Sequence, residues 1–100
     1  MDKNILKQAQ QLQAKMMKTQ EELAKMTIEA TSGGGAITVE ITGQQEITSI
    51  KISPEVVDPE DVELLEDMIL AAIKEATQKS RELMEKKMGA LTGGLSLPGF

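Results

Sequence analysis

The stretch from Thr27 to Ser53 limits the possible folds of this chain more than any other part of it. Here apolar and polar residues alternate, which is the pattern of a β-strand with one apolar face. Two links that contain glycine, 32–35 and 43–44, divide the stretch, and glycine supplies the positive φ that tight hairpins need. The stretch therefore predicts three short strands in an antiparallel meander. The apolar positions are Ile28, Ala30, Ile37, Val39, Ile41, Ile50 and Ile52.

The third strand contains an irregularity, because Ile47 is out of phase with Ile50 and Ile52. Such a shift predicts a β-bulge near Thr48 and Ser49, or a side chain that faces the other way. A three-stranded sheet with one apolar face is only marginally stable alone, since that face and the strand edges are uncovered. We therefore expect the flanking helices, and a second copy of the chain, to cover it.

The composition indicates one small domain without redox or metal chemistry. The chain has 100 residues, of which 40% are apolar, and this is enough for a single core. It contains no cysteine and no histidine, so a disulfide framework, a thiol nucleophile, the usual general base and the usual zinc ligands are all missing. We expect no enzymatic activity, no cofactor and no metal. No apolar run approaches the length of a membrane span, which predicts a soluble cytoplasmic protein without a membrane partner.

The segment 3–26 predicts a long helix, because it lacks glycine and proline and is rich in good helix formers. Apolar residues recur in it at alternating spacings of four and three, which is a heptad seam with one polar interruption. A continuous seam predicts a packing partner along the whole helix. The seam consists of Ile5, Ala9, Leu12, Met16, Thr19, Leu23 and Met26.

Five lysines form a stripe on the side of this helix away from the seam. At about 100° per residue they fall within an arc of roughly 120°. Two of them, Lys18 and Lys25, have a glutamate four residues away, but Lys3, Lys7 and Lys15 have no acidic partner at that spacing. The stripe fits either an ordinary solvated helix face or a surface that binds phosphates.

A second long helix is predicted over residues 59–88. The run 58–61, with the sequence DPED, supplies an N-cap, a proline at the first helical position and acids in the first turn, and Gly89 supplies a stop. A helix of about thirty residues is roughly 45 Å long, whereas a compact chain of this length is only about 34 Å across. The helix must project from the body or lie against another chain, which together with the uncovered sheet predicts a homodimer.

The predicted domain covers residues 1–89, and residues 90–100 form a flexible tail that contains glycine and proline. Candidate residues for seam or dimer packing come from both helices. They are Ile5, Leu12, Met16, Leu23, Leu65 and Ile69. The formal net charge of −5 and the single aromatic residue argue against a nucleic-acid partner unless the cations are segregated on one surface.

The order of these parts resembles the YbaB/EbfC family of bacterial nucleoid-associated proteins over nearly the whole chain. The most specific likenesses are the glycine-rich turn between strands, the DPED helix start followed by a leucine-rich stretch, and the LTGGL run at residues 91–95. The resemblance implies an α+β fold with a long N-terminal helix, a three-stranded antiparallel sheet and a long C-terminal helix. It also implies a tweezer-like homodimer in which long helices project as arms.

The same resemblance implies a DNA-binding function in the cytoplasm and nucleoid. The protein is expected to bind double-stranded DNA with little sequence specificity, to alter its conformation, and to contribute to nucleoid organisation and gene regulation. The hypothesised DNA contacts are Lys3, Lys7, Lys15, Lys18, Lys86 and Lys87. The alternative is a protein–protein adaptor of the replication or repair apparatus that docks its seam or tail on a partner and has only incidental DNA affinity.

Overall fold

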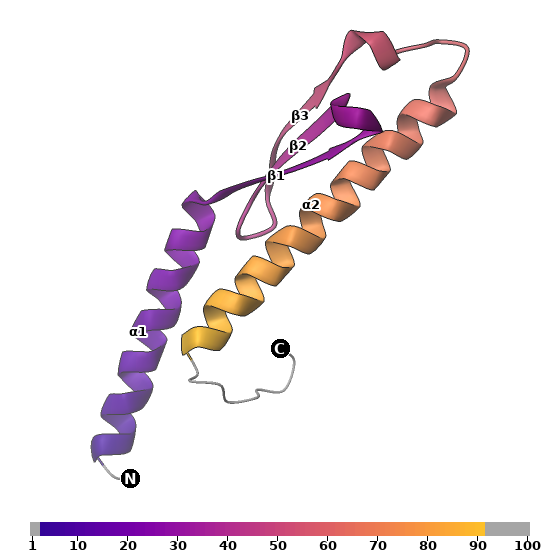
Figure 1. Cartoon of the computed structure of the whole chain (residues 1–100). Helices are drawn as coiled ribbons and strands as arrows, with labels where there is room; N and C mark the ends of the chain where they lie inside the picture. Colours follow the sequence, from indigo (N-terminus) through magenta and orange to yellow (C-terminus); the bar gives the residue numbers. More distant parts are fainter. Residues whose placement is uncertain (1–2, 92–100) are drawn as a thin grey trace.

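The computed structural model describes residues 3–91, which form two long helices and a three-stranded sheet (Figure 1). The helices are α1 (Lys3–Lys25) and α2 (Val62–Leu91), the strands are β1 (Thr27–Ser32), β2 (Ile37–Thr42) and β3 (Ile47–Ile52), and two short 3-10 turns are η1 (Gly33–Gly35) and η2 (Pro54–Val56). This arrangement confirms the predicted α+β fold. Most of the predicted tail, from residue 92 onward, lies outside the described residues. Within residues 3–91, neither helix is long and apolar enough to cross a membrane.

The strands form one antiparallel sheet in the order β1-β2-β3, as the sequence predicts. The register places Ile28 opposite Ile41, and it places Val39 between Ala30 and Ile50. Because residues paired across two strands point to the same side of a sheet, the apolar positions of all three strands share one face. The alternation in the sequence therefore determines which face must be covered.

The predicted β-bulge is present in β3. Glu40 pairs with Ser49, but the next residue of β2, Ile41, pairs with Ile47, so that Thr48 is the extra residue. The bulge restores Ile47 to the apolar face. It explains why this isoleucine is out of phase with the rest of its strand in the sequence.

The hydrophobic core lies between α2 and the first two strands. The small side chains of Ala72 and Ala76 are completely buried and let the helix approach the sheet closely. β3 lies outside this cover, because Ile47, Ile50 and Ile52 are 40%, 44% and 38% exposed. The described residues thus leave one strand of the apolar face uncovered. The buried core consists of Ala30, Ile37, Val39, Ile41, Ala72 and Ala76.

The two hairpin links use glycine in different ways. All three glycines of η1 have positive φ, between 62° and 93°, as predicted. In the second link the positive φ of 64° belongs to Gln45 and not to Gly43, so the prediction that a glycine supplies it was wrong there. Gly43 is required for space instead, since a Cβ at this position would lie 2.7 Å from the carbonyl oxygen of Leu23.

α2 begins and ends three residues later than predicted. Asp58 does not cap the helix, because its carboxylate accepts the Glu60 N–H at 3.0 Å and closes a local turn. Asp61 is the N-cap instead, since its Oδ1 accepts the Leu64 N–H at 3.3 Å. At the other end Gly89 keeps a helical backbone and does not adopt the positive φ of a stop, so the helix continues past it.

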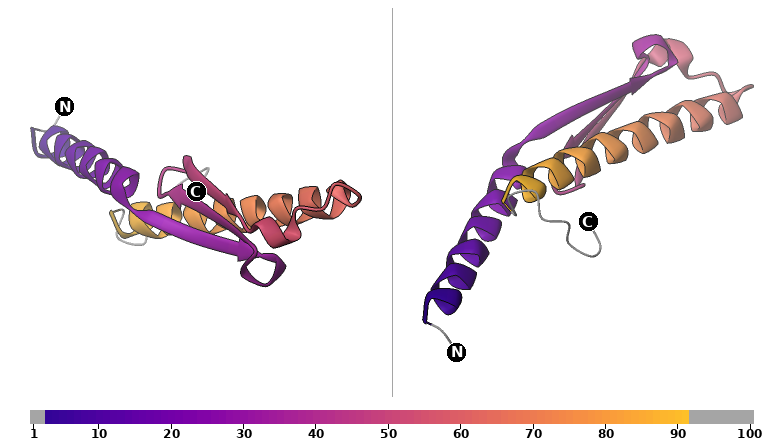
Figure 2. Two further views of the ribbon diagram at one scale, coloured as in Figure 1. Left: turned by 90° about the horizontal axis from the view of Figure 1, so that it is seen from above. Right: turned by 60° about the horizontal axis from the view of Figure 1, so that its bottom comes forward.

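The molecule is elongated, with extents of 68 × 23 × 17 Å and a radius of gyration of 18.8 Å, against about 13 Å for a compact chain of this length. Figures 1 and 2 show the cause: α1 leaves the sheet at its C-terminal end and extends away from it. α1 buries Thr19 and Leu23, whereas every side chain from residue 3 to 15 is exposed. The predicted partner along the whole of α1 is therefore not supplied by the chain itself, and a partner from a second copy of the chain stays a prediction.

Candidate nucleic-acid interface

α1 carries its lysines on the part of the molecule that extends furthest from the sheet. The four predicted contacts on this helix are all exposed, namely Lys3, Lys7, Lys15 and Lys18. For Lys3, Lys7 and Lys15 the exposure does not depend on the side of the helix, because every residue from 3 to 15 is exposed. The stripe therefore points into solvent, away from the protein body.

α2 adds two lysines at the same end of the molecule. Figures 1 and 2 show the C-terminal end of α2 near α1, and Lys86 is exposed while Lys87 is half-buried. Lys79, further back on α2, is engaged within the protein. Its Nζ lies 3.5 Å from the Glu75 carboxylate and donates to the carbonyl of Glu29 at 3.1 Å. The structure thus brings the predicted contacts of both helices to one end and leaves Lys79 to hold α2 against β1.

A segment rich in acidic residues lies at the other end of the molecule. Residues 55–67 contain seven Asp or Glu and no Lys or Arg, and they lie around η2 and the start of α2, far from α1 (Figure 1). This segment contributes −7 to the formal charge of −5, so the remaining residues together carry +2. The long axis of 68 Å greatly exceeds the screening length of about 10 Å in ordinary salt. The net acidity therefore does not prevent the α1 end from attracting a polyanion.

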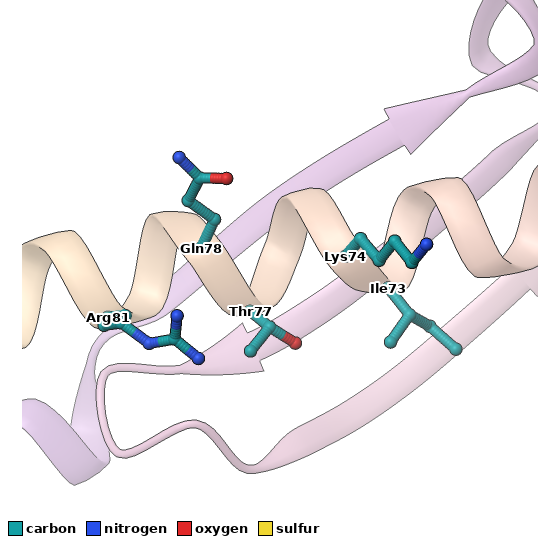
Figure 3. Close-up of a pocket in the computed structure, with 5 residues that line it drawn as sticks. All are labelled: Ile73, Lys74, Thr77, Gln78 and Arg81. Atoms are coloured by element: carbon teal, nitrogen blue, oxygen red, sulfur yellow. The ribbon is translucent and has the colours of Figure 1, made fainter.

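A shallow depression of about 270 Å³ lies on α2 beside the sheet (Figure 3). Its lining combines apolar, polar and cationic side chains, and Ile73 and Thr77 point from α2 toward the β3 side of the sheet (Figure 3). Its two cations, Lys74 and Arg81, were not among the predicted site residues. The sequence feature that could have identified them is their spacing of seven residues, because this spacing places both side chains on one side of a helix. The lining residues are Ile73, Lys74, Thr77, Gln78 and Arg81.

The six candidate packing residues have different environments in the single chain. Leu23 is buried and Met16 is half-buried where α1 meets the body. Leu65 and Ile69 are also half-buried, but they pack against the sheet core and not against the seam of α1. Ile5 and Leu12 are 58% and 37% exposed. The structure therefore does not bring these residues together within one chain.

Comparison with known proteins identifies the family. Residues 1–95 match the YbaB/EbfC DNA-binding family. The chain belongs to this family. A nucleoid-associated protein from Alkaliphilus metalliredigens is 52% identical over 97 residues, which cover 97% of this chain and 85% of that protein. A nucleoid-associated protein from Chloroflexus aurantiacus is 54% identical over 93 residues and covers 93% of each chain.

A solved structure has the same fold. The crystal structure of the uncharacterized protein HP0035 from Helicobacter pylori superposes with a TM-score of 0.83 at 18% identity, covering 93% of this chain and 99% of that one. At this identity the likeness establishes the fold alone. The family is described by DNA binding, and none of the comparisons supports the adaptor alternative.

Proposed function

We propose that this YbaB/EbfC protein binds double-stranded DNA as a homodimer in the cytoplasm and nucleoid, where it contributes to nucleoid organisation and gene regulation. The contacts are made to phosphates by lysines of α1, with help from the C-terminal end of α2. The proposed contact residues are Lys3, Lys7, Lys15, Lys18, Lys86 and Lys87. Relatives named nucleoid-associated proteins at 52% and 54% identity support the cellular role.

The separation of charge along the molecule is the observation that carries this proposal. α1 holds five lysines and two glutamates, is exposed on its whole N-terminal half, and lies at the end opposite to the acidic segment 55–67. A helix with unpaired lysines on one side can replace condensed counterions on a duplex, and the release of those ions drives binding. An ordinary solvated helix face gives no reason for the lysines of α1 to lie at the end opposite to this acidic segment.

Contacts between lysines and phosphates predict that the protein binds DNA with little sequence specificity. Lysine side chains that bind phosphates fix the position of the protein but read no bases. The single aromatic residue of the chain is Phe100, so stacking on bases contributes little. Affinity is therefore nearly the same for duplexes of different sequence. A dimer with two projecting α1 arms changes the path of the duplex, because the DNA must follow the separation of the arms to reach both.

A second copy of the chain covers the surfaces that the single chain leaves apolar. Ile47, Ile50 and Ile52 of β3 are exposed on the face that α2 covers elsewhere, and Ile73 borders the depression on the same side (Figure 3). β3 is also an edge strand, and an exposed edge beside an apolar face is unfavourable in water. A homodimer removes both from solvent. It also doubles the number of lysines that face one duplex.

A binding curve measured at several salt concentrations tests the proposed function. Three to five lysines per chain in a dimer neutralise roughly six to ten phosphates, so log affinity should fall against log salt with a slope of about −5 to −9. Two duplexes of unrelated sequence and equal length should give the same curve within a few-fold. Absence of binding by the wild-type protein in moderate salt would reject the DNA-binding role and favour the adaptor alternative.

A further inference from the structure

We propose that the β2–β3 turn, residues 42–46, sets the angle between the two helices that carry lysines, and that Gly43 and Ser80 are positioning residues for DNA binding. This inference rests on the proposed function. The turn contacts the C-terminal end of α1 on one side and the middle of α2 on the other. It is therefore the joint from which both sets of lysines extend.

On the α1 side, the turn caps the helix. α1 has no glycine at its C-terminus to satisfy its last carbonyl groups in the usual way. Instead the Gly43 N–H donates to the carbonyl of Leu23 at 2.9 Å and to that of Met26 at 3.2 Å. The side-chain amide of Gln44 donates to the carbonyl of Gln20 at 2.6 Å. Two carbonyls of the last turns of α1 and that of Met26, just after the helix, thus accept hydrogen bonds from two consecutive residues of a distant segment.

This contact leaves no room for a side chain at position 43. Gly43 is buried, and a Cβ added there would lie 2.7 Å from the Leu23 carbonyl oxygen and 2.8 Å from Leu23 Cδ2. Both distances are shorter than nonbonded carbon contacts allow. Any larger residue must push the end of α1 away from the turn.

On the α2 side, one buried hydroxyl fixes the turn. Ser80 is completely buried, its Oγ donates to the carbonyl of Thr42 at 2.7 Å, and it accepts the N–H of Gln45 at 3.1 Å. Gln45 has the strained φ of 64°, and its N–H is shared between Ser80 Oγ and the Thr42 carbonyl, each at 3.1 Å, so that the hydroxyl ties both ends of the turn to α2. Without the hydroxyl, the Thr42 carbonyl and the Gln45 N–H keep their 3.1 Å hydrogen bond to each other but lose their hydrogen bonds to α2.

Helix geometry turns a small change at this joint into a large displacement of the lysines. Lys3 precedes Leu23 by twenty residues, or about 30 Å at 1.5 Å per residue. A tilt of about 10° at Leu23 therefore moves Lys3 by about 5 Å. This exceeds the rise of about 3.4 Å between successive phosphates of one strand. The angle of α1 thus decides which lysines reach phosphates together.

The test measures the angle and the DNA affinity in the same full-length protein. Since the chain has no cysteine, Gln10→Cys on α1 and Ala71→Cys on α2 provide two unique exposed sites for spin labels. Dilution with unlabelled protein keeps the measured distance within one chain of a dimer. Gly43→Ala should shift or broaden this distance by several ångström and weaken duplex binding about tenfold. It should also flatten the salt slope by at least one unit, although no charge changes. Ser80→Ala should act in the same direction.

Two control variants separate positioning from a general loss of stability. Gly89→Ala makes the same substitution in α2, where an added Cβ meets no atom within 4 Å. Ile37→Val loosens the buried core of the sheet away from the turn. Both controls should keep the wild-type distance and the wild-type salt slope, even though Ile37→Val lowers the melting temperature.

The outcomes distinguish this inference from the proposed function. Wild-type distance and slope in folded Gly43→Ala and Ser80→Ala would overturn the positioning role, whether or not the protein binds DNA. If Gly43→Ala does not fold, Gln44→Ala decides, because it removes only the exposed amide contact with Gln20. An unchanged distance in Gln44→Ala together with Ser80→Ala would then overturn it. Failure of the wild-type protein to bind DNA would reject the function and leave the distance result intact.

Discussion

The two long helices of this protein both carry apolar residues at helical spacing, but they lie in different environments. α2 packs Ala72 and Ala76 against β1 and β2 and holds the sheet along most of its length. α1 has the more regular apolar seam, yet it buries only Thr19 and Leu23 and extends into solvent. The difference teaches that a heptad seam shows a helix can pack, while the presence of a complementary surface decides whether it does. β3 and the N-terminal half of α1 each expose apolar side chains that no other part of the described chain covers.

The largest effect should come from placing a charge on the packed side of α2. Ala76→Asp puts a carboxylate at a completely buried position of the core, which costs several kcal/mol. This is comparable to the whole stability of a small domain. We expect loss of a cooperative melting transition by circular dichroism. The matched change on α1, Ala14→Asp at an exposed position, should alter stability by less than about 1 kcal/mol. Equal effects would show that α1 is packed as tightly as α2.

The next largest effect concerns the uncovered face of β3. Ile50→Glu puts a charge on that face, whereas Lys51→Glu changes the charge on the opposite face of the same strand. Light scattering at micromolar concentration should give the wild-type protein and Lys51→Glu twice the chain mass of 10.8 kDa. It should give Ile50→Glu a mass near that of one chain, because an uncompensated buried charge opposes association. A wild-type mass near 11 kDa would contradict the dimer.

A smaller effect should follow from removing charge from α1. The double variant Lys7→Ala and Lys15→Ala should bind all duplexes about tenfold more weakly or worse, and flatten the salt slope by up to four units for two sites in each of two chains. Helix content should not change, since both side chains are exposed. Lys51→Ala is the control, because it removes an exposed lysine from β3. Unchanged affinity and slope in the double variant would make the stripe an ordinary solvated face.

The smallest effect should occur at the end of α2. Gly89 has a helical backbone, so Gly89→Ala should raise stability by up to about 1 kcal/mol. Gly33→Ala should do the opposite, because Gly33 has φ of 62° and an added Cβ would meet the sulfur of Met68 at 2.5 Å. Thermal melting compares the two variants directly. A loss of stability in Gly89→Ala would show that α2 stops before Leu91 in solution.

Much of the fold could be predicted because its causes are local. Alternation with period two determines the strands and their shared face, and the phase error at Ile47 determines the bulge. The spacing of apolar residues and lysines also predicts a helix in segment 3–26 with lysines on one side. The helix start was predicted less well, because Asp58 and Asp61 have equal capping ability. Hydrogen-bond geometry, which the sequence does not contain, chooses Asp61.

The sequence by itself therefore determined the helices and strands, the face of the sheet that must be buried and the lysine stripe. Each of these features depends only on residues that are close together in the sequence. Only the tertiary structure decided that α2 covers β1 and β2 but leaves β3 exposed, and that the acidic segment 55–67 lies at the end opposite to α1. The tertiary structure also placed Gly43 against the end of α1 and Ser80 against the β2–β3 turn. Leu23 lies twenty residues before Gly43, and Thr42 lies 38 residues before Ser80. Close contacts between segments so far apart leave no periodic trace in the sequence.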